Sequence, residues 1–104
     1  MSNIAEISIH RDEQLFAPTH YSWVVSSFGA YPDESVGSPR GAGLHTVAAA
    51  LQAAMSAAIE NGFDGARITY IGADKRVHTV DAVLRAGPVT MERARAAADH
   101  LMAQ

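Results

Sequence analysis

The sequence predicts an α+β fold in which an antiparallel sheet carries one long central helix and a C-terminal helix packed on one face. Three observations indicate this: two strand-like stretches precede a long alanine-rich helical stretch, two more follow it, and a second helical pattern lies near the end of the sequence. The order is therefore β-β-α-β-β-α. Helices on one face of an antiparallel sheet are the simplest way to bury the apolar side of each element.

The first two predicted strands lie in the N-terminal quarter of the sequence. In residues 4–10, Ala5, Ile7 and Ile9 alternate with polar residues, which is typical of a half-buried strand. Residues 21–28 are rich in aromatic and β-branched residues. A Gly- and Pro-rich loop is expected over residues 29–43. Loops of this length are uncommon in compact domains and usually have a functional role.

The long helix is expected over residues 46–60, with Thr46 as its N-cap and Asn61-Gly62 as its stop. Its apolar stripe predicts core packing. The opposite face is small and neutral instead of charged, and consists of Ala49, Ala50, Gln52, Ala53, Ser56 and Ala57. This composition predicts that either the last helix of the chain or another molecule packs against that face.

The second half of the sequence predicts two further strands and the last helix. Residues 66–72 form the third strand, and residues 76–84 form a fourth strand antiparallel to it. The second of these stretches also fits a helix, because Val77, Val80 and Leu84 would share one helical face. After Gly87-Pro88, Thr90 is expected to cap a helix over residues 91–103.

Composition limits the possible classes of function. The 104 residues, without cysteine, form a single domain over 1–104. The sequence shows no leader and no membrane span, so we expect a soluble, cytoplasmic protein. A formal net charge of -3 disfavours nucleic-acid binding, which requires clustered Lys and Arg. The acidic balance instead fits a protein partner.

A small anionic ligand is the second class that the sequence suggests. The glycine-rich stretch 37–43 runs directly into the long helix, whose N-terminus offers free N–H groups and a partial positive charge. The candidate binding residues are Ser38, Arg40, Gly41 and Gly43. Their spacing matches neither a P-loop nor a dinucleotide fingerprint, so an ordinary flexible loop is the alternative.

The sequence predicts no catalytic residue, no metal site and no cofactor. The five histidines, at positions 10, 20, 45, 78 and 100, form no pair at the close spacing typical of zinc ligands. Three serines lie in the second strand, but no nucleophile-elbow motif surrounds them.

Candidate contact residues for a protein partner come from two regions. Tyr31, Asp33 and Glu34 form an acidic, aromatic patch in the predicted loop, and aromatic anchors dominate many interfaces. Ala49, Ala53 and Ala57 lie on the neutral face of the long helix. These features predict a protein that docks on a larger protein or forms a homodimer.

From the long helix to Asp74, the sequence resembles a ribonuclease H-type half-fold. The matching features are the helix from Val47, the Asn61-Gly62 turn, the following strand and the closing aspartate. The resemblance extends to HicB-type antitoxins, a non-catalytic version of that fold. It implies a small acidic inhibitor that neutralises a basic toxin and dimerises. A degenerate metal-dependent nuclease is the third hypothesis, but the first turns of the helix contain no acid for two-metal chemistry.

Overall fold

The computed structural model describes residues 4–12, 19–27, 36–37, 44–72, 75–84 and 88–103. Its elements follow the predicted order, and each predicted strand and helix is confirmed to within two residues at either end. A two-residue strand, β3, also lies within residues 29–43, where the sequence predicts a loop. The elements are β1 (Ile4–Asp12), β2 (His20–Ser27), β3 (Val36–Gly37), α1 (Val47–Glu60), β4 (Gly65–Ile71), β5 (Val77–Val83) and α2 (Met91–Met102).

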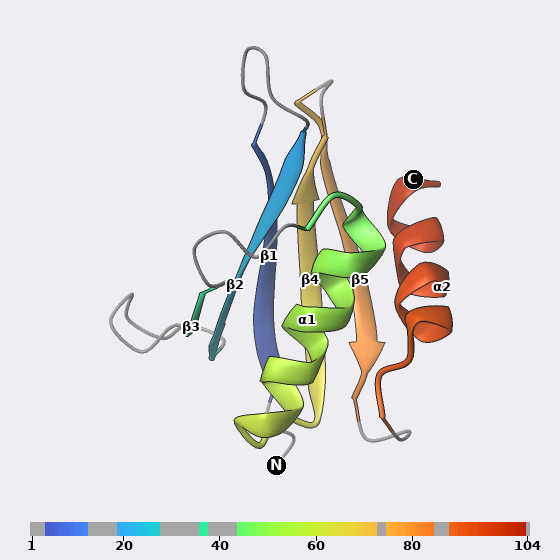
Figure 1. Cartoon of the computed structure of the whole chain (residues 1–104). Coiled ribbons are helices and arrows are strands. Elements are labelled where there is room, and N and C mark those ends of the chain that lie inside the picture. Colours follow the sequence, from blue (N-terminus) through green and yellow to red (C-terminus); the bar gives the residue numbers. More distant parts are fainter. Residues whose placement is uncertain are drawn as a thin grey trace.

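The sheet has the strand order β3-β2-β1-β4-β5 (Figure 1). The two predicted hairpins are confirmed, because β1 pairs antiparallel with β2 and β4 pairs antiparallel with β5. The fourth predicted strand is therefore a strand, and its helical alternative is wrong.

One feature of the predicted sheet needs correction, because the two hairpins meet through a parallel pair, β1 with β4. The sheet is thus mixed and not wholly antiparallel. The reason is the path of α1, which runs back along the sheet and ends where β1 begins (Figure 1). The chain then enters β4 in the same direction as β1, as a helical crossover requires.

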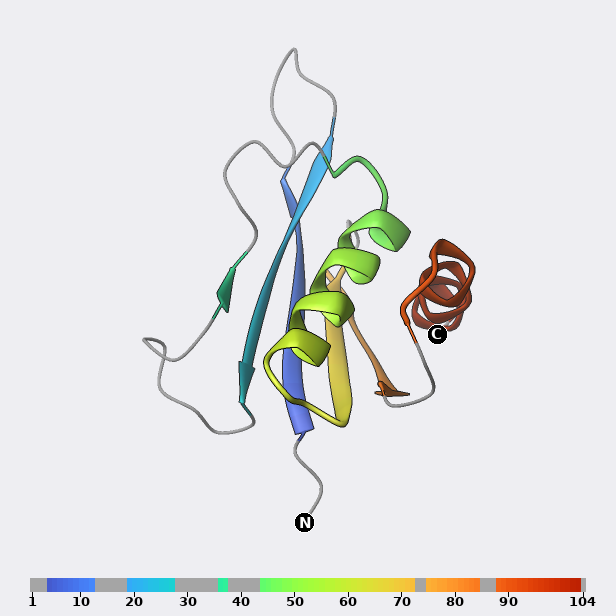
Figure 2. The same cartoon turned by 60° about the horizontal axis from the view of Figure 1, so that its bottom comes forward.

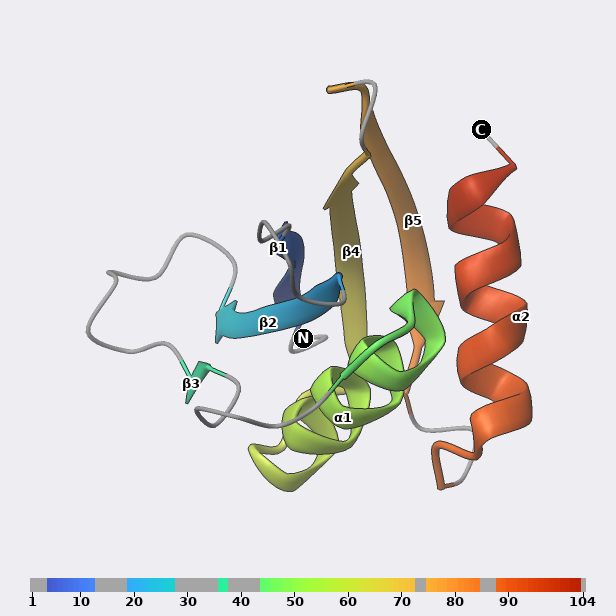
Figure 3. The same cartoon turned by 45° about the horizontal axis from the view of Figure 1, so that its top comes forward.

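Both helices lie on the same face of the sheet (Figures 2 and 3). α1 packs over β1 and β2, whereas α2 lies beside α1 and over β5. The largest fully buried side chains come from both layers: Ile7, Ile9, Val25, Leu51, Ile68, Tyr70, Leu84 and Leu101. The core therefore lies between the sheet and one helical layer, and neither of the two described helices covers the other face of the sheet.

Local sequence signals determine where α1 begins and ends. The Thr46 hydroxyl accepts a hydrogen bond of 3.0 Å from the Ala49 amide, which satisfies one free N–H of the first turn. Beyond the C-cap residue Asn61, Gly62 has a φ of +85°, a conformation that favours glycine. Both predicted boundary signals are confirmed.

α2 is fixed to the end of β5. The Thr90 hydroxyl accepts from the Arg93 amide, and the Arg93 guanidinium donates to the Val83 and Pro88 carbonyls. These bonds hold the first turn of α2 against the strand that precedes it. Among the described residues, neither helix is long and apolar enough to cross a bilayer.

Candidate functional site

Most of the predicted ligand and contact residues lie outside the described part of the chain. This applies to the anion-site candidates Ser38, Arg40, Gly41 and Gly43, to the patch of Tyr31, Asp33 and Glu34, and to Asp74. The alanines of α1 are described, so the neutral face of the long helix can be placed in the fold.

The neutral face of α1 divides into a buried part and two flanks. Ala50 is fully buried in the core, so this part of the predicted face is wrong. Gln52 donates to the Val89 carbonyl at 3.4 Å, just before α2 begins. Each helical residue advances about 100° around the axis, so Ala53 and Ala57 occupy the flank turned away from α2. They are half-buried and pack against the edge of the core, whereas Ala49 is half-buried outside that cluster.

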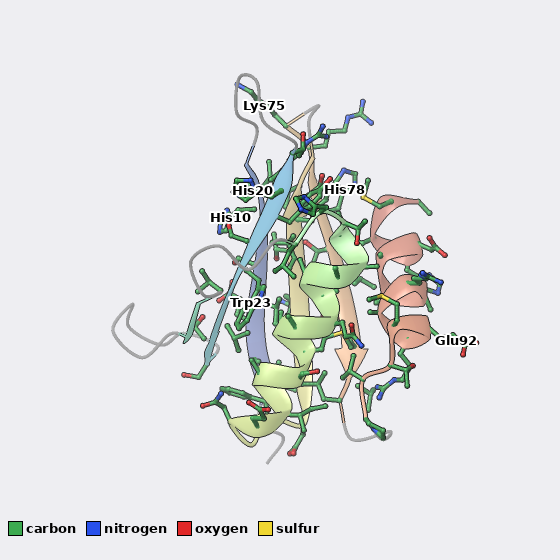
Figure 4. The ribbon with its side chains drawn as sticks, viewed as in Figure 1. His10, His20, Trp23, Lys75, His78 and Glu92 are labelled. Atoms are coloured by element: carbon green, nitrogen blue, oxygen red, sulfur yellow. The ribbon has the colours of Figure 1, made fainter. Side chains whose placement is uncertain are left out.

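A cluster of polar aromatic side chains lies at the end of the helix-covered face where α1 begins. The rings of Tyr21 and Tyr70 are 6.4 Å apart, and those of Tyr70 and His78 are 6.1 Å apart. The Tyr21 amide donates to the Leu44 carbonyl at 2.7 Å, which ties this cluster to the segment leading into α1. Figure 4 shows His78 at the level of the first turn of α1.

Burial is the largest influence on the pKa of Tyr70 within this cluster. Tyr70 is 1% exposed, and its burial raises the pKa of its phenol above the ordinary value. The neighbouring Tyr21 raises this pKa further, while the Arg11 guanidinium, hydrogen-bonded to the same hydroxyl, lowers it. Tyr70 therefore remains a neutral phenol at neutral pH.

The second candidate surface is the face of the sheet that neither described helix covers, which we call the open face. Successive residues of a strand point to opposite sides of the sheet. The pairing of the strands therefore determines which residues belong to the open face. On the four long strands, every member except the buried Gly65 is half-buried or exposed: Ile4, Glu6, Ser8, His10, His20, Ser22, Val24, Ser26, Gly65, Arg67, Thr69, Ile71, Val77, Thr79, Asp81 and Val83.

Apolar side chains lie at both ends of the open face. Ile4 and Val83 flank Gly65 at one end and are 38% and 69% exposed. Ile71 and Val77 pair with each other at the other end and are 47% and 63% exposed. Four of the six large hydrophobic side chains that are exposed among the described residues thus lie on this one face.

A row of charges with alternating sign crosses the middle of the open face. Glu6, Arg67 and Asp81 are register partners on β1, β4 and β5. Arg67 Nε donates to Asp81 Oδ1 at 3.2 Å, and both side chains are well exposed. Small hydroxyl side chains form the next row, where Ser8, Thr69 and Thr79 are register partners. The centre of the face is therefore polar and lies between two apolar ends.

The histidines are distributed over different parts of the fold. His10 and His20 lie on β1 and β2, away from His78 on β5 (Figure 4). Within the described ranges, no group of three His, Asp or Glu residues is close enough to hold a metal ion.

Sequence reasoning missed both candidate surfaces. A signal was present, since Tyr70 and His78 alternate in phase with the buried residues of their own strands, and Val77 and Val83 alternate out of phase with them. Comparison with protein-family models, with curated proteins and with solved structures finds no match.

Proposed function

We propose that this protein is a small non-enzymatic interaction module, of the inhibitor or antitoxin-like kind, that docks on a protein partner through the open face of its sheet. One observation supports this above all: both helices pack on one side of the sheet, while Ile71, Val77 and Val83 remain 47–69% exposed on the other. Exposed apolar residues that gather on one face mark interaction sites more often than residues scattered singly.

The chemistry of the open face fits protein recognition better than nucleic-acid recognition. Its central row contains Glu6 and Asp81 against one Arg67, whereas phosphate binding requires an excess of cations. Apolar ends around a polar centre give a partner both area to bury and charges that fix its orientation.

The test compares two arginine substitutions in cross-linking experiments on lysate from the native host. Thr69→Arg places a long cation in the middle of the open face, while Ala96→Arg makes the same addition on the exposed side of α2. We expect cross-links from the wild-type protein and from Ala96→Arg to map to open-face residues, and Thr69→Arg to lose them. Cross-links that map to the helical layer, or that survive Thr69→Arg, would contradict the proposal.

A second candidate function is binding of a small anion where α1 begins. The first turn of α1 contains no acidic residue, so no described side chain of that turn neutralises its partial positive charge. Arg11 on β1 is the register partner of Tyr21 on β2, and the Tyr21 amide donates to the Leu44 carbonyl just before α1. The Arg11 cation therefore lies at the end of the fold where α1 begins. Inorganic phosphate should then raise the melting temperature, and Arg11→Ala should remove most of that rise. An equal rise in both proteins would rule this site out.

A further inference from the structure

Resting on the proposed role of the open face, we infer that the partner seated on it is a second copy of this chain, packed sheet against sheet. Three properties of the open face support this occupant: the size of the face, the position of its apolar side chains and the alternation of its charges.

The face has the size of a small, reversible protein interface. Four strands at about 4.8 Å spacing, each with about seven residues at about 3.3 Å, span roughly 20 by 23 Å. That is close to the lower limit of stable interfaces, which bury about 600 Å² of accessible surface from each partner. Interfaces near this limit are typically weak and transient, so the mass of the protein should depend on its concentration.

The apolar side chains lie where a second sheet would cover them. Two sheets that stack face to face lie about 10 Å apart, with their strands within about 30° of each other. At this separation, side chains from both faces fill the space between the backbones. Ile71 and Val77 at one end, and Ile4 and Val83 at the other, would then lose their contact with water on both sides of the charged row.

The charges distinguish between the two symmetric arrangements that overlap all four long strands. A two-fold axis that runs parallel to the strands and midway between β1 and β4 exchanges the positions of these two strands. Because Glu6 and Arg67 are register partners, this axis places Arg67 opposite Glu6 of the partner subunit, and Glu6 opposite the partner's Arg67. An axis along the charged row would instead place Arg67 opposite its own copy, and like charges directly opposite one another destabilise a pairing. Across the first axis, the Glu6 and Arg67 charges are therefore self-complementary, as a two-fold dimer requires.

The first experiment measures mass by size-exclusion chromatography with light scattering from low micromolar to millimolar concentration. The mass of the wild-type protein should rise from 11.0 kDa toward about twice that value. Thr69→Arg should raise the dimer dissociation constant at least tenfold, whereas the matched substitution Ala96→Arg should leave it unchanged. Far-UV circular dichroism establishes that each variant is folded. If Thr69→Arg is not folded, Arg67→Glu replaces it, because Arg67 is well exposed.

The second experiment tests the charge pairing itself. Arg67→Glu and Glu6→Arg should each weaken the dimer at least tenfold, and the double variant should recover most of the wild-type affinity, because it restores opposite charges across the two-fold axis. As a control, Arg95→Glu makes the same charge change on the exposed side of α2 and should have no effect.

A mass that stays at 11.0 kDa up to millimolar concentration overturns the second copy as the occupant. Equal effects of Thr69→Arg and Ala96→Arg on the dimer dissociation constant would also overturn it. The same holds if the double variant dimerises as weakly as the two single variants. In each of these cases, loss of lysate cross-links on Thr69→Arg would still support docking of a different protein, so failure of the dimer and failure of the proposed function remain distinguishable.

Discussion

The phenol ring of Tyr70 lies against the imidazole ring of His78, with the ring centroids 6.1 Å apart and the ring planes inclined by 29°. The two residues are register partners on β4 and β5, and both point into the helix-covered side of the sheet. Tyr70 is 1% exposed and His78 is 9% exposed. Two ring side chains therefore belong to the end of the core where α1 begins, and burial there favours the neutral form of the Tyr70 phenol by raising its pKa.

The buried phenol predicts a loss of stability in alkali. Because the pKa of Tyr70 is raised in the folded protein, the unfolded chain releases this proton first, at a pH near 10.0. The free energy of unfolding should then fall as pH rises above that value, and this contribution is fully present below it. Urea unfolding between pH 8 and 11 should show a shallower decline for Tyr70→Phe than for the wild type.

Tyr21→Phe provides the control for that experiment. Burial is the largest cause of the raised pKa and Tyr21 only adds to it, so this variant should keep most of the alkaline decline. If the free energy of unfolding falls equally steeply with pH for Tyr70→Phe and the wild type, then Tyr70 has the same pKa in the folded and unfolded chains.

The attachment of α2 to the core predicts that alanine substitutions at two adjacent residues lower the free energy of unfolding by very different amounts. Leu101 is fully buried, while its neighbour Met102 is 55% exposed. Leu101→Ala should lower the free energy of unfolding by about 2–5 kcal/mol, since it removes buried methyl groups and leaves a cavity. Met102→Ala should change it by less than about 0.5 kcal/mol. Denaturant midpoints measure both, and a loss for Leu101→Ala as small as the one expected for Met102→Ala would show that α2 contributes little to the core.

Local signals made most of this fold predictable. Alternation in residues 4–10 and the boundary residues Thr46 and Gly62 each act over a few positions, so the strand, the cap and the stop follow from the sequence. The parallel pairing of β1 with β4 depends on where the chain goes after α1, and no local pattern encodes that direction. The sequence alone therefore predicts an antiparallel sheet and not the mixed sheet that forms.

The candidate surfaces were harder to predict for the same reason. Glu6, Arg67 and Asp81 lie far apart in sequence and become a row only through the register of three strands. Likewise, the neutral composition of α1 indicates close packing but does not show which alanine faces the sheet. Ala50 does, and Ala49 does not.

That difference between neighbouring alanines is itself testable. Ala50 is fully buried, so Ala50→Leu should force the core apart and lower the free energy of unfolding by about 1–3 kcal/mol. Ala49 is only half-buried, and Ala49→Leu should stay within about 0.5 kcal/mol of the wild type, because leucine is nearly as good a helix former as alanine. Thermal or urea unfolding measures both, and an equal loss would place Ala49 in a packed contact as well.

The end of α1 gives a test of backbone conformation without side-chain packing. Gly62 has a φ of +85°, and a Cβ added there would meet no atom within 4 Å. Gly62→Ala should therefore cost only the strain of a left-handed residue, about 1–2 kcal/mol. Gly62→Asn should cost less, because asparagine tolerates this conformation better than alanine does. Urea unfolding of the two variants measures the difference, and an alanine variant as stable as the asparagine variant would show that α1 does not require a left-handed residue at this position.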